Sequence, residues 1–239
     1  MGNIEPTIMI YGEPGDLGAN GDTGENGKNT VEDNTGQPGR KGKTGYGRCD
    51  RCATSGTKGA DAKVGATGGN GTEGGVPPNF RLIVSTFQFS NPETTLLISS
   101  NGGDGGPGGT GGIGGKGAAG GRAGKNPGNC KKCDPPALGG PGGDGGNGGQ
   151  GGNSGNGGNG GAISVYYGNP DHITQISLSS QPGQGGPFSQ GGLGGNGGPG
   201  GENDGGSNAP AGRHGAQAGS GNPGLNGQPG TTSLLPKPG

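Results

Sequence analysis

Residues 102–116 read GGDGGPGGTGGIGGK, in which a pair of glycines recurs with a strict three-residue period. The same period continues in residues 139–153 and 191–202. Glycine loses more backbone freedom on folding than any other residue, so a sustained glycine period needs a structural cause. The usual cause is close approach of two backbones, and left-handed polyproline-II helices have three residues per turn. The period therefore predicts glycine-lined helices of this kind, packed side by side.

The composition places the source of order in the backbone rather than in a side-chain core. The chain has 72 glycines and 20 prolines among 239 residues, and only 22% of its residues are hydrophobic. A conventional core for a chain of this length cannot be assembled from so few apolar side chains. Such a composition without a period is typical of disorder, and the period present here favours an ordered chain. We expect the N–H and carbonyl groups of neighbouring helices to pair, because buried backbone groups need partners.

Three apolar segments can be aligned with one another, and each leads into a glycine run: residues 7–15, 95–103 and 175–183. They define one domain of three related units, at about 1–79, 80–161 and 162–239. In the second and third units a preceding apolar segment, 80–89 or 163–167, ends at an Asn-Pro-acid turn signal, which predicts a β-hairpin. Residues 231–235 are a candidate for the missing strand of the first unit.

The predicted fold class is therefore mostly irregular and polyproline-II: a bundle of glycine-rich left-handed polyglycine-II helices with short β-hairpin strands. A collagen-like homotrimer is a rival, because residues 12–29 form Gly-X-Y triplets. Their runs are short, however, and the later Gly-Gly-X runs leave no Y position where proline stiffens collagen. We favour packing within a single chain.

The segment at residues 142–150, GGDGGNGGQ, resembles the polyglycine-II bundle proteins. This group includes springtail antifreeze proteins and the receptor-binding tips of phage tail-fibre adhesins, and the resemblance implies the same helix packing. The antifreeze members imply a flat face of small residues, whereas this chain places Asp, Pro, Thr, Ile, Lys, Asn and Gln at the third positions, which disfavours ice binding. The adhesin tips imply loops rich in aromatic residues, whereas this chain has four Tyr and four Phe. A fold of this type does not define a function.

The four cysteines form two C-x-x-C pairs, Cys49 with Cys52 and Cys130 with Cys133. Two such pairs that converge provide four thiolates in a tetrahedral arrangement, which is the ligand set of structural zinc. We therefore predict a zinc site at Cys49, Cys52, Cys130 and Cys133. Disulfides, which stabilise proteins with little core, are one alternative, and redox or iron–sulfur chemistry is another. His214 is a candidate for an additional ligand, although a histidine in a glycine-rich loop is more often solvated, and His172 is expected at the surface.

No motif indicates catalysis. Residues 37–44, QPGRKGKT, approach a phosphate-binding loop but have Gln37 where its first glycine belongs. No Ser/His/Asp or Cys/His arrangement occurs in a recognisable context. The net charge of −1, with acidic and basic residues interspersed, excludes the electrostatic footprint of nucleic-acid or anionic-membrane binding. We expect a protein that is not itself an enzyme.

The leading functional prediction is a structural or interaction subunit, a rigid scaffold or docking module whose partners are other protein subunits. One alternative is the receptor-binding tip, or adhesin, of a fibre. Another is an accessory metal-binding subunit of a multisubunit enzyme such as a carboxylase. The first residues, MGNIEP, lack the features of a secretory signal, which predicts a cytoplasmic location or a place in a phage or extracellular particle.

Overall fold

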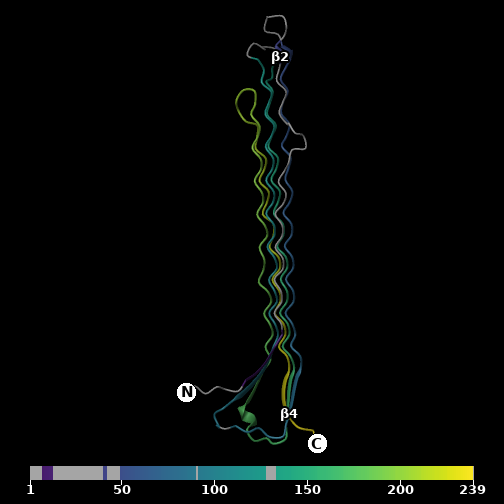
Figure 1. Cartoon of the computed structure of the whole chain (residues 1–239), viewed down its shortest axis with the longest axis vertical. Coiled ribbons are helices and arrows are strands. Elements are labelled where there is room, and N and C mark those ends of the chain that lie inside the picture. Colours follow the sequence, from purple (N-terminus) through teal and green to yellow (C-terminus); the bar gives the residue numbers. More distant parts are fainter. Residues whose placement is uncertain (1–6, 13–39, 42–48, 90, 128–132, 239) are drawn as a thin grey trace.

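The computed structural model describes residues 7–12, 40–41, 49–89, 91–127 and 133–238. The molecule is a long, narrow rod, with most of its strands gathered at one end and the short strand β2 at the other (Figure 1). The elements are β1 (Thr7–Tyr11), β2 (Arg40–Lys41), β3 (Cys49–Arg51), β4 (Phe80–Val84), β5 (Leu96–Asn101), β6 (Ile163–Tyr167), the 3-10 helix η1 (Ile173–Gln175), β7 (Ile176–Ser179) and β8 (Thr232–Pro236). Among the described residues, no helix is long and apolar enough to span a membrane.

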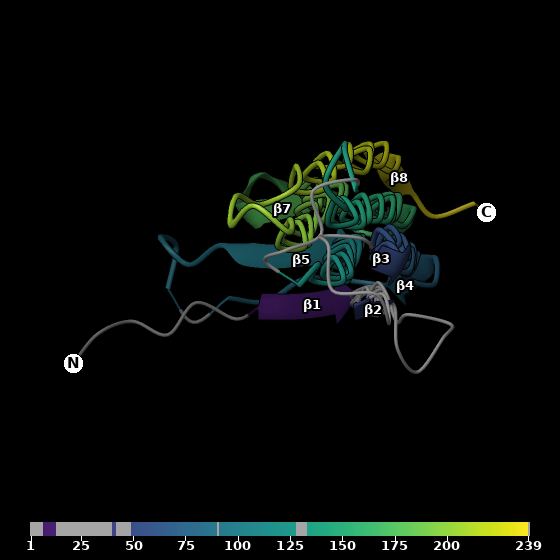
Figure 2. The same cartoon turned by 90° about the horizontal axis from the view of Figure 1, so that it is seen from above.

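Two three-stranded parallel sheets form the strand end of the rod. One has the order β1-β5-β7 and the other the order β4-β6-β8. Figure 2, a view along the rod, shows β1, β5 and β7 side by side. Alternate side chains of each strand point into a small core, as expected of strands with a period of two. Its buried members are Phe87, Ile98, Ile163 and Val165.

The predicted fold class is wrong. The regular elements of the described chain are parallel β-sheets, a two-stranded antiparallel ribbon of β2 and β3 and one 3-10 helix, with no polyproline-II helix bundle and no hairpin at the predicted places. The two turns do occur, but the strands before and after each turn enter different sheets: β4 pairs with β6, and β5 pairs with β7. The chain crosses from one sheet to the other at each turn, so strands pair with their counterparts in the next unit, in parallel. The segment predicted at residues 231–235 forms β8, the third strand of the β4-β6-β8 sheet.

Five described glycine-rich segments run along the rod: 53–79, 102–127, 137–162, 180–202 and 208–231. We call them the glycine segments; they are neither helical nor β-strand. Segments 102–127 and 180–202 continue from β5 and β7, and the other three lead into β4, β6 and β8. Backbone hydrogen bonds recur at every third residue, and they join parallel neighbours within a layer, as from Gly102 to Gln181 and from Ala123 to Glu202. Between layers the partners are antiparallel, as from Gly103 to Gly75 and from Gly121 to Thr57.

Close approach between these segments explains the paired glycines. A Cβ atom added at Gly142 would meet the carbonyl of Gly198, and one added at Gly143 would meet the carbonyl of Ala60, both nearer than 3.0 Å. Those carbonyls belong to two different segments. Each glycine of a pair therefore faces a different neighbouring backbone, and the third residue is the one whose side chain has room.

Candidate interaction surface

The predicted zinc site is wrong. Cys52 and Cys133 form a disulfide with a Cα–Cα distance of 5.5 Å, so their sulfurs are bonded to each other and are not available as thiolate ligands. Among the described residues, no group of three or more His, Cys, Asp and Glu side chains is placed to hold a metal ion. The side chain of Cys49 and the whole of Cys130 lie outside the described residues. The disulfide alternative is thus confirmed for one cysteine from each C-x-x-C pair.

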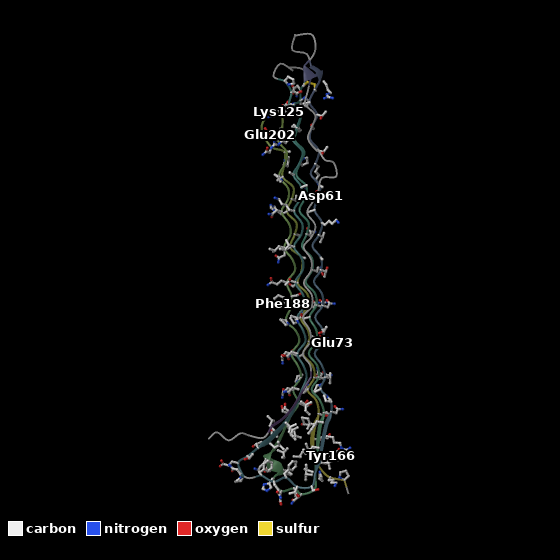
Figure 3. The ribbon with its side chains drawn as sticks, viewed as in Figure 1. Asp61, Glu73, Lys125, Tyr166, Phe188 and Glu202 are labelled. Atoms are coloured by element: carbon white, nitrogen blue, oxygen red, sulfur yellow. A yellow bond between two sulfur atoms is a disulfide. The ribbon has the colours of Figure 1, made fainter. Side chains whose placement is uncertain are left out.

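The Cys52–Cys133 bridge closes a chain loop across a sequence separation of 81 residues, at the end of the rod opposite the parallel sheets (Figure 3). A bridge within one C-x-x-C pair would restrict only a few residues. Restricting a loop of this length lowers the entropy of the unfolded chain, which stabilises the folded chain by about 4.5 kcal/mol on the loop-entropy model. The disulfide therefore ties the distal end of glycine segment 53–79 to the chain just before segment 137–162.

The two histidines are not metal ligands in the described structure. The Nδ1 atom of His214 lies 3.2 Å from the Oδ1 atom of Asn196, and both side chains are exposed. His172 adopts a left-handed backbone conformation, with φ 66°, just before η1. Its Nδ1 atom is 2.8 Å from Oε1 of Gln175, and its ring packs edge-on against Phe89. His172 therefore belongs to the loop packing at the strand end.

Asn and Asp side chains at the third positions perform a task that the sequence analysis missed. Where segment 137–162 faces segments 53–79 and 208–231, the Oδ1 atom of an Asn or Asp accepts a hydrogen bond from a backbone N–H of the next segment. Segment 137–162 supplies five such bonds to segment 208–231, from Asp144, Asn147, Asn153, Asn156 and Asn159. Segment 53–79 supplies equivalent bonds to segment 137–162 from Asp61 and Asn70. These donors are the ones that the glycine packing leaves unpaired, so the repeated Asn and Asp residues complete the lateral hydrogen bonding.

An ion pair reinforces one of these side-chain hydrogen bonds, the one accepted by Asp61 on the exposed face of segment 53–79. We call the whole set of these Asn and Asp hydrogen bonds the amide ladder. The Nζ atom of Lys58 lies 2.7 Å from Oδ1 of Asp61, and the same oxygen accepts the N–H of Asp144. The hydrogen bond from Lys58 and then the backbone N–H of Asp144 hold the pKa of Asp61 below its usual 3.8. The hydrogen bond to Asp61 raises the pKa of Lys58 above 10.5. Both groups are solvent-exposed, so salt screens the pair strongly.

The outer face of the β4-β6-β8 sheet carries an exposed apolar row. The parallel register places Ile83 beside Tyr166 and Tyr166 beside Leu235. Ile83 is 50% exposed and Leu235 is 45% exposed. The guanidinium of Arg81 lies 5.0 Å from the ring centroid of Tyr166, whose position near the strand end is labelled in Figure 3. Parallel sheets are usually covered on both faces, so this row is the most prominent candidate contact surface at the strand end.

Two cavities lie on the layer that continues the β1-β5-β7 sheet. One, of about 410 Å³, lies where the strands pass into the glycine segments and is lined by Asn101, Asp104 and Gln181 among others. The second, of about 340 Å³, lies near the disulfide end, between Arg122, Glu202 and Asn208. Glu202 also faces Lys125 at 3.8 Å, and both are labelled near that end in Figure 3. Neither cavity brings together a nucleophile and a base of the kind that catalysis requires.

No family model and no curated protein matches the chain. Among solved structures, the chain is similar to the nine polyproline type II helical bundle springtail antifreeze protein from Granisotoma rainieri, with 22% identity over 85% of this chain and 97% of that one. The TM-score is 0.11, so this similarity carries no argument about fold or function.

Proposed function

We propose that the chain is a non-enzymatic structural and interaction module, a rigid rod that separates a contact surface at its strand end from a disulfide-closed tip. The lateral hydrogen bonding supports this proposal most directly. Backbone bonds at every third residue join each described glycine segment to its neighbours, and Asn or Asp side chains satisfy many of the remaining donors. Segments tied at such short intervals along their whole length resist bending, which is the property of a spacer.

The strand end is the proposed docking end for a protein partner. The row formed by Ile83, Tyr166 and Leu235 is apolar and exposed, and it lies on a sheet of a type that is normally covered. Exposed apolar patches on otherwise polar surfaces mark protein contacts. The disulfide favours an oxidising environment, so we propose that the protein works outside the cytosol or as part of an extracellular particle.

Small-angle scattering tests the spacer role. A compact chain of 239 residues has a radius of gyration of about 18 Å. We expect a value well above this, with the distance distribution of a rod that does not change between low and high salt. A value near that of a compact chain, or a distribution typical of a flexible coil, would contradict the rod.

Purification from the native source tests the docking end. The wild-type chain and a double variant, Ile83→Ser with Leu235→Ser, serve as baits. A protein partner recovered by the wild type and lost by the double variant supports docking through the apolar row. Equal recovery by both baits would place the partner elsewhere on the rod.

A receptor-binding tip of a fibre is the second candidate, and the polar cavity near the disulfide favours it. Arg122, Glu202 and Asn208 provide a cation, a carboxylate and an amide on one small concave surface. A glycan array probed with the wild type and with Arg122→Ala discriminates the two proposals. Binding that depends on Arg122 supports the receptor-binding tip, whereas no binding leaves the spacer as the better proposal.

A further inference from the structure

The described chain contains seven Asn-Gly steps, which are the chemically least stable type of asparagine step. The backbone nitrogen of the glycine attacks Cγ of the asparagine, ammonia leaves, and a five-membered succinimide ring forms. Water then opens the ring to give aspartate or isoaspartate, so one water is consumed for each ammonia released. Asparagine is accordingly counted among the thermolabile residues. The attack requires a glycine N–H that is free to leave its hydrogen bond and rotate.

Six of the seven steps have this N–H engaged. Each of the six glycine amides donates to a carbonyl of a neighbouring segment, at 2.8 to 3.0 Å. The six glycines are Gly71, Gly102, Gly148, Gly157, Gly160 and Gly227. The lateral bonding that stiffens the rod therefore also restrains the nucleophile at these steps.

Asn196-Gly197 differs from the other six. Within the described residues, the N–H of Gly197 has no hydrogen-bond partner, although the carbonyl of Asn196 accepts from Gly117. The reason lies in the neighbouring segment. The N–H of Gly185 is satisfied by Oδ1 of Asn226, across an antiparallel pair of segments. Gly197 lies 12 residues after Gly185, and the residue 12 before Asn226 is His214.

His214 thus occupies the position from which an asparagine would have accepted the N–H of Gly197. Its ring is directed instead to the side chain of Asn196, with Nδ1 at 3.2 Å from Oδ1. In the tautomer with hydrogen on Nδ1, the imidazole donates to this oxygen. That bond polarises the side-chain carbonyl and makes Cγ a better electrophile, while the attacking N–H is left unpaired.

We propose that Asn196 is the site at which the folded protein deamidates, with His214 as the positioning residue that assists the ring closure. An aspartate product carries a negative charge beside His214. An isoaspartate product adds one carbon to the backbone between Gly195 and Gly198, whose amides donate to Gly146 and Gly143. The extra backbone carbon therefore shifts the hydrogen-bond register of segment 180–202 between Asn196 and the turn at residues 203–207.

Peptide mapping by mass spectrometry of the intact, oxidised protein after incubation in neutral buffer tests the proposal. Breaking a lateral hydrogen bond before attack slows a protected step, so we expect Asn196 to convert at least about tenfold faster than Asn147, Asn156 and Asn159. In concentrated urea the four rates should become similar, because the lateral bonds are gone. Similar rates in the folded protein, or no conversion at Asn196, would overturn the proposal.

Two variants separate the roles of the two side chains. Asn196→Gln should abolish the fast conversion without loss of folding, because Gln184 and Gln190 already occupy third positions of the same segment. His214→Ala, which removes the imidazole without adding an acceptor for the N–H of Gly197, should slow conversion at Asn196 several-fold and leave the protected steps unchanged. An unchanged rate at Asn196 in His214→Ala would refute the assisting role of the histidine.

Discussion

The substitution Gly146→Ala tests whether close backbone approach is what requires glycine in the rod. Gly146 is buried in the central segment 137–162. A Cβ atom there would collide with the backbone of Lys63. The N–H of Gly146 donates to Gly115 at 2.9 Å, and its carbonyl accepts from Gly195 at 2.8 Å. One added methyl group therefore disturbs the contacts of this segment with three neighbouring segments.

The expected cost follows from two contributions. Forcing a methyl group into a closely packed site costs about 1–3 kcal/mol. The two weakened hydrogen bonds, with Gly115 and Gly195, add about 0.5–1.5 kcal/mol each. Together they lower the free energy of unfolding by about 4 kcal/mol, which for a chain of this size corresponds to a decrease in melting temperature of about 8–16 °C.

The matched control is Gly219→Ala, at a glycine of a neighbouring segment where an added Cβ meets nothing within 4 Å. Both variants restrict the unfolded chain equally, so the difference between them isolates the folded state. The assay is thermal unfolding followed by far-ultraviolet circular dichroism, with the disulfide intact. We expect Gly219→Ala to melt at or slightly above the wild type. If the two variants melted together, close approach would not be the reason for the glycine period.

Three further predictions address other features of the rod. Asn153→Ala removes the side-chain oxygen that accepts the N–H of Asn222 and should cost about 0.5–1.5 kcal/mol, whereas Asn153→Asp, which keeps Oδ1, should cost less; denaturant unfolding distinguishes them. Reduction of Cys52–Cys133 should lower stability by up to about 4.5 kcal/mol, measured by melting with and without reductant, and an unchanged melt would refute the loop-entropy argument. The folded pKa of Asp61 is lowered, so the stability that its carboxylate contributes is fully present above the unfolded pKa and is lost as the pH falls through the folded pKa. The folded pKa of Lys58 is raised, so the stability that its ammonium group contributes is fully present below the unfolded pKa and is lost only as the pH rises through the folded pKa. The free energy of unfolding of Asp61→Asn should therefore differ slightly from that of the wild type at neutral pH and low salt and should match it in strong acid. A difference in unfolding free energy that persisted in strong acid would show that the ion pair is not the cause of the difference.

Several local features were predictable because they depend on neighbouring residues alone. The aligned segments at residues 7–15, 95–103 and 175–183 contain β1, β5 and β7. The turn signals at Asn91-Pro92 and Asn169-Pro170 mark real reversals of the chain, because proline and asparagine act on the backbone beside them. The β-hairpins that we predicted from these turn signals were wrong. A turn signal specifies that the chain reverses, but it does not specify which sheet the next strand joins.

The cysteine site shows a second limit of sequence reasoning. Two C-x-x-C pairs are compatible with disulfide bonding as well as with the zinc ligation that we predicted, and connectivity cannot be deduced from spacing. The lateral arrangement of the glycine segments brings Cys52 to Cys133, which selects a bridge. The amide ladder was missed for a related reason: the partners of Asn153 and Asn156 lie 69 residues away, at a separation that has no signature in either local stretch.

The sequence by itself determined that glycine recurs every third residue, that short apolar segments interrupt the glycine runs, and that no conventional core is possible. These properties follow from composition and period, which no fold can alter. Tertiary structure decided the parallel sheets, the disulfide partner, the ladder of Asn and Asp side chains, and the single Asn-Gly step left with an unpaired amide among those described. Each of these depends on which segment lies beside which. That choice is made by the whole set of lateral hydrogen bonds acting together, because no local stretch of glycine prefers one neighbour over another.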